Sequence, residues 1–282
     1  MSAVVEPRPA RAGMVVVRVP RLGWSTRVDA RAVLVTVVLL AVALGVFAWL
    51  LTIGDYSIAL SDVIRTLLGQ GEGGGDYVVR ELRLPRGLTG LLVGAAFGMA
   101  GAIFQRLAHN PLASPDIIGI SAGAATAATF AIVVLNLGGT EVTLAALFGS
   151  AAAALAMFVL AYRGGVAGYR LVLVGIGVHA VLTATTQYLL TRARVTEAQQ
   201  ALVWLTGSLN ARSWDHLRPV AWALAVAVPV TLALARQIRV LELGDDTARG
   251  LGARVDGARG ALFAVGVGLP AIATAAPGPI GF

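Results

Sequence analysis

Long apolar blocks recur along the chain, separated by short segments that hold most of the arginines. Each block is about twenty residues long, the length that an α-helix needs to cross ~30 Å of hydrocarbon. The first block is too long for the roughly 7–15-residue apolar core of a secretory signal, so it is a retained span. The pattern predicts seven transmembrane helices, at about residues 32–53, 87–106, 117–137, 141–162, 171–191, 218–235 and 260 to the end.

Composition favours a membrane protein over a soluble one. Hydrophobic residues make up 57% of the 282-residue chain and charged residues 13%, with a mean hydropathy of +0.80. An ordinary soluble domain carries about 25% charged residues, so half of the expected charge is missing. We therefore expect an all-α polytopic membrane protein, with residues 1–31 as a cytoplasmic N-terminal tail and residues 32–282 as the transmembrane domain.

The basic residues bear on orientation and on partners. The net charge is +7 and all 22 basic residues are arginine. They lie between apolar blocks instead of along one aromatic-rich face, which argues against nucleic acid as a partner. With the N-terminus inside, 14 arginines fall on inner segments and 8 on outer ones. Cytoplasmic loops carry an excess of basic residues, so we expect the N-terminus in the cytoplasm.

Several kinds of chemistry lack the residues they need. The chain has no cysteine and three scattered histidines, so we expect no thiol chemistry, metal site or cofactor. It has no lysine, so the phosphate-binding P-loop is absent and any ATPase must be a separate chain. No ionisable residue lies well inside a predicted span, which disfavours an ion-coupled secondary transporter. No acid–base pair or nucleophile elbow indicates an enzyme.

The most informative stretch, Leu82 to Ala124, reads LRLPRGLTGLLVGAAFGMAGAIFQRLAHNPLASPDIIGISAGA. Its helix carries small residues at three- and four-residue spacing, which allow close helix packing in lipid or line a pathway. An Asn-Pro and a Ser-Pro pair then break the helix, and the freed backbone groups must face protein or water. A broken element at the inner mouth of a pathway and a plain turn fit equally well. The candidate pathway and packing residues are Gly94, Gly98, Gly101, Gln105, Asn110, Pro111, Pro115, Gly119, Ser121 and Gly123.

This stretch resembles the FecCD-type permeases, the membrane subunits of ATP-binding-cassette (ABC) importers for ferric siderophores, haem and cobalamin. The resemblance rests on three features: the sequence RLPR at the start of the helix, a small-residue helix that ends in Gln, and the pattern NPLA-x-P-x-x-x-G-x-S-x-GA after it. It continues through WLTGS, LELGDDTARGLGARV and GPIGF, and it covers roughly residues 50–282. Ferric siderophore is the commonest cargo of the family, and haem and cobalamin stay open as alternatives.

The resemblance implies the fold of one half of a type II ABC importer, with about seven of the family's ten transmembrane helices present. Because the chain ends inside an apolar block, we expect the sequence to be incomplete, with three further spans after GPIGF, and the 282 residues alone not to transport. The implied partners are ABC ATPase subunits, an extracytoplasmic substrate-binding protein and a second permease subunit, identical or related. The chain itself would lie in the lipid of a bacterial plasma membrane.

Arginines at the outer end of the second span are candidates for contact with a binding protein. Arg83 and Arg86 flank Pro85, and Arg80 is a weaker candidate on the same segment. Snorkelling of these side chains to the membrane interface is the simpler interpretation. The resemblance implies instead that they meet carboxylates on the binding protein. Charge complementarity of that kind fixes the docking orientation and speeds encounter.

The inner loop at residues 236–259 predicts a short helix at about 247–251, capped by Asp245 or Asp246 and ended by Gly252. Its mixed charge is typical of a solvated surface helix. The match to LELGDDTARGLGARV implies instead a coupling helix that sits in a cleft of the ATPase subunit. The residues assigned to that contact are Leu243, Gly244, Asp245, Asp246, Ala248, Arg249, Leu251 and Gly252.

Two smaller patterns lie outside these motifs. Residues 61–68 predict a short amphipathic helix on the outer surface, with a cap residue at Ser61-Asp62. His179, Thr183 and Gln187 share one face of the fifth span, where hydrogen bonding between helices is a simpler interpretation than a ligand site.

Overall fold

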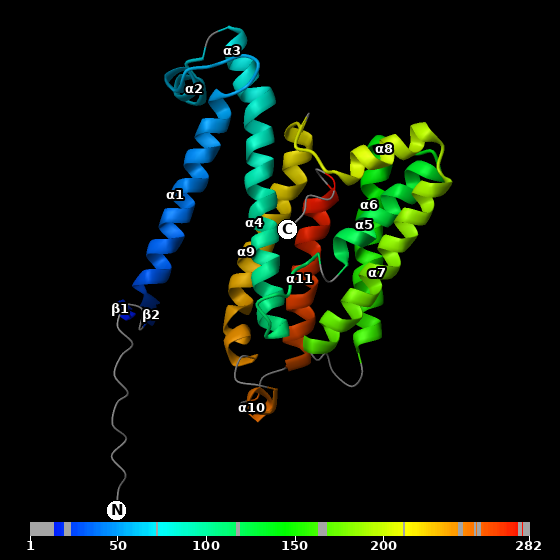
Figure 1. Cartoon of the computed structure of the whole chain (residues 1–282). Helices are drawn as coiled ribbons and strands as arrows, with labels where there is room; N and C mark the ends of the chain where they lie inside the picture. Colours follow the sequence, from blue (N-terminus) through cyan, green and yellow to red (C-terminus); the bar gives the residue numbers. More distant parts are fainter. Residues whose placement is uncertain are drawn as a thin grey trace, which may run out of the picture. The chain divides into compact units, whose positions relative to one another are not determined.

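A computed structural model describes residues 14–19, 24–71, 73–116, 119–162, 168–210, 212–241, 245–250, 252, 255–275 and 278. The chain divides into two compact units, Met1–Asp76 and Tyr77–Phe282. Figure 1 draws the first unit in blue to cyan and the second in cyan to red.

The first unit begins with two antiparallel strands, β1 (Met14–Val19) and β2 (Trp24–Asp29), in a register that sets Met14 opposite Asp29. Valine-rich sequence favours the extended backbone here. Both strands lie in the segment that the sequence sets apart as a tail, outside the predicted helical domain. From Ala30 onward, every regular element of the described residues is a helix.

The first apolar block forms α1 (Ala30–Thr52), whose N-terminus is capped by Asp29 Oδ1, which accepts from Arg31 N at 2.9 Å. At 23 residues, α1 is about 35 Å long, enough to cross the hydrocarbon core of a membrane. This confirms the predicted span.

The predicted amphipathic helix is α2 (Leu60–Leu67), followed by the single turn α3 (Gly74–Tyr77). Of the apolar positions on which the prediction rested, Val63 is buried, whereas Ile64, Leu67 and Leu68 are exposed. The N-cap is Ala59, which makes no side-chain bond, so the predicted cap at Ser61-Asp62 is wrong.

The second unit is helical in its described residues. A π-helical segment, η2 (Val78–Arg83), runs directly into α4 (Leu84–Ala108). Figure 1 shows α4, α9 and α11 as packed neighbours, and α5, α6 and α7 as a second group. The helices after α4 are α5 (Ile120–Val133), α6 (Gly139–Ala161), α7 (Gly168–Arg192), α8 (Val195–Leu205), α9 (Trp214–Leu241), α10 (Asp245–Gly250) and α11 (Val255–Ala275).

Six helices of the described chain are long and apolar enough to cross a membrane, one fewer than predicted. The block at residues 117–137 contains α5, which has 14 residues and a length of about 21 Å, short of the ~30 Å core. Gly119 (φ +87°) precedes α5 and Asn136 (φ +54°) follows it, so backbone turns bound the helix on both sides. The six spans are Ala30–Thr52, Gly74–Ala108, Gly139–Ala161, Arg170–Arg192, Trp214–Ala235 and Gly257–Ala275.

Aromatic side chains join α4, α6 and α11 into one core. Phe104 and Phe263 meet edge to face with ring centroids 6.0 Å apart, and the Phe158 ring lies 5.4 Å from Phe263. A second cluster joins α4, α9 and α11 around Phe97 and Val220. These contacts cover one side of α4 and fix the direction in which its other side points.

Candidate functional site

α4 ends at the Asn-Pro break that the sequence predicts. His109 closes the helix in the left-handed region (φ +49°), and Asn110 N donates back to the carbonyl of Gln105 at 3.1 Å. Asn110 Oδ1 accepts a hydrogen bond from Leu112 N at 2.9 Å, and this bond between a side chain and the backbone stabilises the turn. Pro111 lacks the N–H that another helical turn would need. Gln105 itself is half-buried.

The segment after the break re-enters the bundle. Gly119 packs against α7, where a Cβ on Gly119 would lie 3.3 Å from the backbone nitrogen of His179. Ser150 Oγ, on α6, donates to the carbonyl of Ile120 at 3.3 Å. His179 and Ser150 lie near the middle of their helices, so α5 begins about halfway along the bundle. Of the two interpretations that the sequence leaves open, this geometry fits the broken element.

Backbone at this depth has to be covered by protein because hydrocarbon cannot satisfy its polar groups. Ala113 is 1% exposed, and Pro115 and Gly119 are also buried. The segment makes hydrogen bonds of its own, from Ala113 N to the Asn110 carbonyl at 3.1 Å and from Gly119 N to the Asp116 carbonyl at 3.0 Å.

Asp116 is an acidic residue of this re-entrant segment that sequence reasoning missed. Ser121 Oγ, in the first turn of α5, donates to Asp116 Oδ1, and Asp116 is half-buried. It escaped notice because it directly precedes the predicted span, and only the inward course of the chain carries it into the bundle. The Ser-Pro-Asp sequence before a glycine is the signal that points to it. Ionisable groups inside membrane proteins are rare and commonly functional, so Asp116 joins the candidate site beside Ser121, which the sequence had already indicated.

The predicted glycines divide into two groups. Gly123 brings α5 against α6, since a Cβ on Gly123 would lie 2.5 Å from the carbonyl oxygen of Gly149. Gly101 is likewise buried. A Cβ on Gly94 or Gly98 would meet nothing within 4 Å, and both residues are exposed. We call this exposed surface the small-residue face of α4; it consists of Gly94, Ala95, Gly98 and Ala102.

Threonines tie α5 to α7. Thr126 Oγ1 lies 2.9 Å from both Thr186 Oγ1 and the carbonyl oxygen of Leu182. His179, on the predicted polar face of α7, has a buried Nδ1 with no hydrogen-bond partner among the described residues. Hydrogen bonding between these two helices therefore comes from the threonines.

The three arginines predicted to meet a binding protein have different surroundings. Arg86 is exposed at the start of α4, Arg80 is half-buried, and Arg83 is 9% exposed. Pro85 is buried between them, and its carbonyl accepts from Thr89 Oγ1 at 2.7 Å. Arg86 is thus the arginine of the three that a partner reaches most easily.

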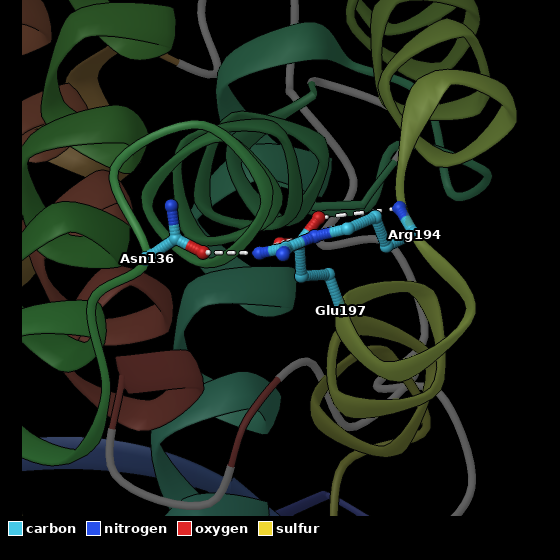
Figure 2. A network of polar contacts seen from close by, with 3 residues as sticks. All are labelled: Asn136, Arg194 and Glu197. Carbon is cyan, nitrogen blue, oxygen red and sulfur yellow. Dashed lines mark hydrogen bonds and ion pairs between the residues drawn. The ribbon is translucent and has the colours of Figure 1, made fainter.

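A polar network at the same end of the second unit was not predicted (Figure 2). Arg194 Nε donates to Glu197 Oε1 at 2.7 Å, and Arg194 Nη2 donates to Asn136 Oδ1 at 3.3 Å. The hydrogen bond raises the pKa of Arg194 and lowers the pKa of Glu197. The network joins the turn after α5 to the start of α8, so Arg194, one of the arginines that the sequence assigned to outer segments, has a structural role. Its signal in the sequence is the Arg-x-x-Glu spacing at a helix start.

The short helix α10 lies at the opposite end of this unit and packs on α9 and α11 (Figure 1). Ala248 is 0% exposed and belongs to the core cluster of Leu107 and Leu262. Gly252 (φ +78°) follows in the left-handed region, as expected for a residue that ends a helix. α10 begins at Asp245, so the predicted start at residue 247 is wrong and both aspartates belong to the helix. Of the other predicted coupling residues, Arg249 lies in α10, and Leu243, Gly244 and Leu251 lie outside the described residues.

Comparisons with known proteins agree with this architecture. The model of the FecCD transport family matches residues 35–282. The chain is 40% identical over 253 residues to the ferric enterobactin transport system permease protein FepG of Escherichia coli, covering 89% of this chain and 77% of that protein. It is 41% identical over 245 residues to the achromobactin transport system permease protein CbrC of Dickeya dadantii, covering 86% and 70%.

A more distant relative and a solved structure extend the comparison. The iron(3+)-hydroxamate import system permease protein FhuG of Bacillus subtilis is 34% identical over 245 residues, which cover 84% of this chain and 73% of that protein. A structure described as an inward-facing metal-chelate-type ABC transporter superposes with a TM-score of 0.75 at 24% identity, covering 86% of this chain and 75% of that one. That superposition establishes the fold.

Proposed function

Because the chain belongs to the FecCD transport family, we propose that it is the membrane permease of a bacterial ABC importer that takes up ferric siderophores. The observation that carries the proposal is the 40% identity over 253 residues to a ferric enterobactin permease. The achromobactin and hydroxamate permeases point to the same class of cargo, a ferric chelate. The fold of a type II importer half accounts for the re-entrant segment and for the bundle around it.

In this proposal two permease subunits face each other across a central pathway. The small-residue face of α4 supports such an arrangement because it is exposed and its glycines have open space in front of them. Small residues let another helix approach closely or leave room for cargo. The re-entrant segment, with Asp116 and Ser121 at its inner end, lines or closes the pathway at mid-depth.

The binding protein docks at the end where α4 begins, through Arg86. An exposed guanidinium in that position attracts a carboxylate over a long range and orients the incoming protein. Arg83 is nearly covered, so its role is to hold the start of α4 while Arg86 makes the contact, with Arg80 at its edge.

The ATPase binds at the opposite, cytoplasmic end, through α10. Because Ala248 is fully buried in the core cluster that contains Leu107 and Leu262, a push on α10 passes directly into α4 and α11. Such rigid coupling needs no flexible linker, since packed cores move as blocks and do not deform smoothly. The arginine count supports a cytoplasmic N-terminus, because 14 arginines then fall on inner segments and 8 on outer ones.

Uptake in a strain that lacks the gene for this permease tests the proposal. Labelled ferric siderophore, haem and cobalamin are supplied in parallel, and the intact gene is returned with or without Arg86→Glu. We expect loss of ferric siderophore uptake alone, restored by the intact gene and weakly by the Arg86 variant.

Arg218→Glu is the matched control, because Arg218 is exposed at the same end but lies 3.4 Å from Asp215. Loss of cobalamin or haem uptake alone would contradict the assigned cargo, and equal effects of both arginine variants would contradict the docking site.

A further inference from the structure

The short helix α2 carries a largely exposed apolar surface. It belongs to the first unit and lies beside the end of α1 (Figure 1). Leu60, Ile64 and Leu67, together with the C-cap residue Leu68, are each at least 49% exposed. Residues three and four apart are neighbours on a helix surface, so these four side chains form one continuous strip, which we call the apolar stripe of α2.

The remaining sides of α2 differ from the stripe. Val63 and Thr66 are buried, and α2 packs against α1. Ser61, Asp62 and Arg65 are exposed, and at about 3.6 residues per turn they occupy an arc separate from the stripe. The exposed surface of α2 is therefore divided into an apolar arc and a polar arc.

Backbone hydrogen bonds hold α2 at both ends and so fix the direction of its stripe. Ile58 N donates to the carbonyl of Thr52 at 3.3 Å, which brings the chain back to the end of α1. At the other end Gln70 N donates to the carbonyl of Arg65 at 2.8 Å, across Gly69 in the left-handed region (φ +83°). That bond is the long hydrogen bond of a Schellman helix ending. The stripe is thus exposed on a helix with defined ends.

The position of α2 along α1 places it at the membrane surface. The span of α1 ends at Thr52, and Leu51 is the buried residue of that helix, where α2 packs on it. Each polar layer of a bilayer is about 5–8 Å thick and a helix is about 10 Å across, so α2 lies within this layer. Trp49 and Tyr56 are exposed on either side of the end of the span, and Trp and Tyr are enriched at this depth.

We propose that the apolar stripe of α2 inserts into the lipid leaflet at the Thr52 end of α1. Leu60, Ile64 and Leu67 contact the first acyl carbons, while the polar arc with Asp62 and Arg65 faces the headgroups and water. Amphipathic helices with this division lie in the plane of the interface. The leaflet is the outer one in the orientation proposed above, and in that respect alone the inference rests on the proposed function.

The composition of α2 favours lipid over a protein partner. The stripe is entirely aliphatic, whereas Trp, Tyr and Arg dominate the energetics of protein contacts. The charges of Asp62 and Arg65 cancel, so the helix offers no net charge to steer a charged partner. The apolar window of α1 is 0% buried by the described chain. Lipid that covers α1 therefore continues onto the stripe, and it removes from water an apolar patch that would otherwise be exposed.

Site-directed spin labelling tests the proposal. The chain has no cysteine, so a single introduced cysteine carries the nitroxide in the permease complex, reconstituted in phosphatidylcholine vesicles. Ile64→Cys and Leu67→Cys report on the stripe. Ser61→Cys is the matched control, because Ser61 is exposed on the polar arc of the same helix. Power saturation compares collisions with oxygen, which concentrates in hydrocarbon, with collisions of a water-soluble nickel chelate.

The two arcs should give opposite results. We expect oxygen collisions to exceed nickel collisions several-fold at Ile64→Cys and Leu67→Cys, and the reverse at Ser61→Cys. Replacement of half of the lipid by phosphatidylglycerol should leave these ratios unchanged, because insertion depends on the apolar side chains and not on lipid charge.

Three results would overturn the lipid assignment. Nickel access at Ile64→Cys and Leu67→Cys as high as at Ser61→Cys would place the stripe in water. Low access of both reagents at the two stripe positions would mean that protein covers them, from the second unit or from another subunit. Loss of oxygen access only when the binding protein is added would make the stripe a docking surface. The labels report depth without any cargo, so failure here and failure of the uptake proposal are distinguishable.

Discussion

The contact of Gly123 with Gly149 allows a quantitative test of how α5 is held. A Cβ on Gly123 would lie 2.5 Å from the carbonyl oxygen of Gly149 and 2.5 Å from Ala153 Cβ. Ordinary contact begins near 3.4 Å, so Gly123→Ala forces α5 and α6 apart by roughly 1 Å. A gap of that size forfeits about a quarter to a half of the dispersion energy of the facing atoms. Overpacking of this kind costs about 1–3 kcal/mol.

Gly177 on α7 provides the matched control for this variant. A Cβ on Gly177 would meet nothing within 4 Å, so Gly177→Ala gains helix propensity, about 0.5–1 kcal/mol, without a clash. Thermal unfolding in detergent compares the two variants. Since 1 kcal/mol shifts the midpoint by about 2–4 °C in proteins of this size, Gly123→Ala should melt several degrees below Gly177→Ala. Equal midpoints would refute the inferred backbone contact between α5 and α6.

Other predictions follow from the small-residue face, α10 and the polar network. Gly98→Trp should abolish uptake while the protein still reaches the membrane, because the side chain fills open space in front of α4; normal uptake would remove this face from the pathway. Ala248→Leu overpacks the site where α10 joins the core, at a cost of about 1–3 kcal/mol, and should lower uptake per ATP hydrolysed; unchanged coupling would exclude this route. The pKa of Glu197 is lowered, so its ion pair with Arg194 is complete above the ordinary pKa of a glutamate and is lost as the pH falls through the lowered value. Hydrogen exchange at the start of α8 should therefore rise on acidification, and Glu197→Gln should exchange fast at every pH; protection independent of pH in the wild type would contradict this.

Six of the seven predicted spans were found, because a long apolar segment can be recognised from its length and polarity. The helix break at Asn110-Pro111 was also predictable, since proline cannot extend a helix. The predicted short inner helix was found two residues earlier than expected, beginning at Asp245. Each of these features depends on residues that are close together in the chain, so the sequence alone predicts it.

What depends on depth and tertiary contact was not predictable. The block at residues 117–137 is apolar throughout, but only packing of Gly119 on α7 places the start of α5 at mid-height. That depth turns Asp116 from a loop residue into an interior one. Spacing suggested that Gly94, Gly98 and Gly101 act alike, yet only the positions of neighbouring helices decide which of them are covered.

Transport by purified components tests the central claim most directly. The permease, reconstituted in vesicles with its ATPase and binding protein, is supplied with labelled ferric siderophore and either ATP or a proton or sodium gradient. Accumulation that requires ATP and the binding protein, and that does not respond to either gradient, is the predicted result. Accumulation driven by an ion gradient without ATP, or ATP-dependent accumulation of cobalamin and not of the ferric chelate, would contradict the account.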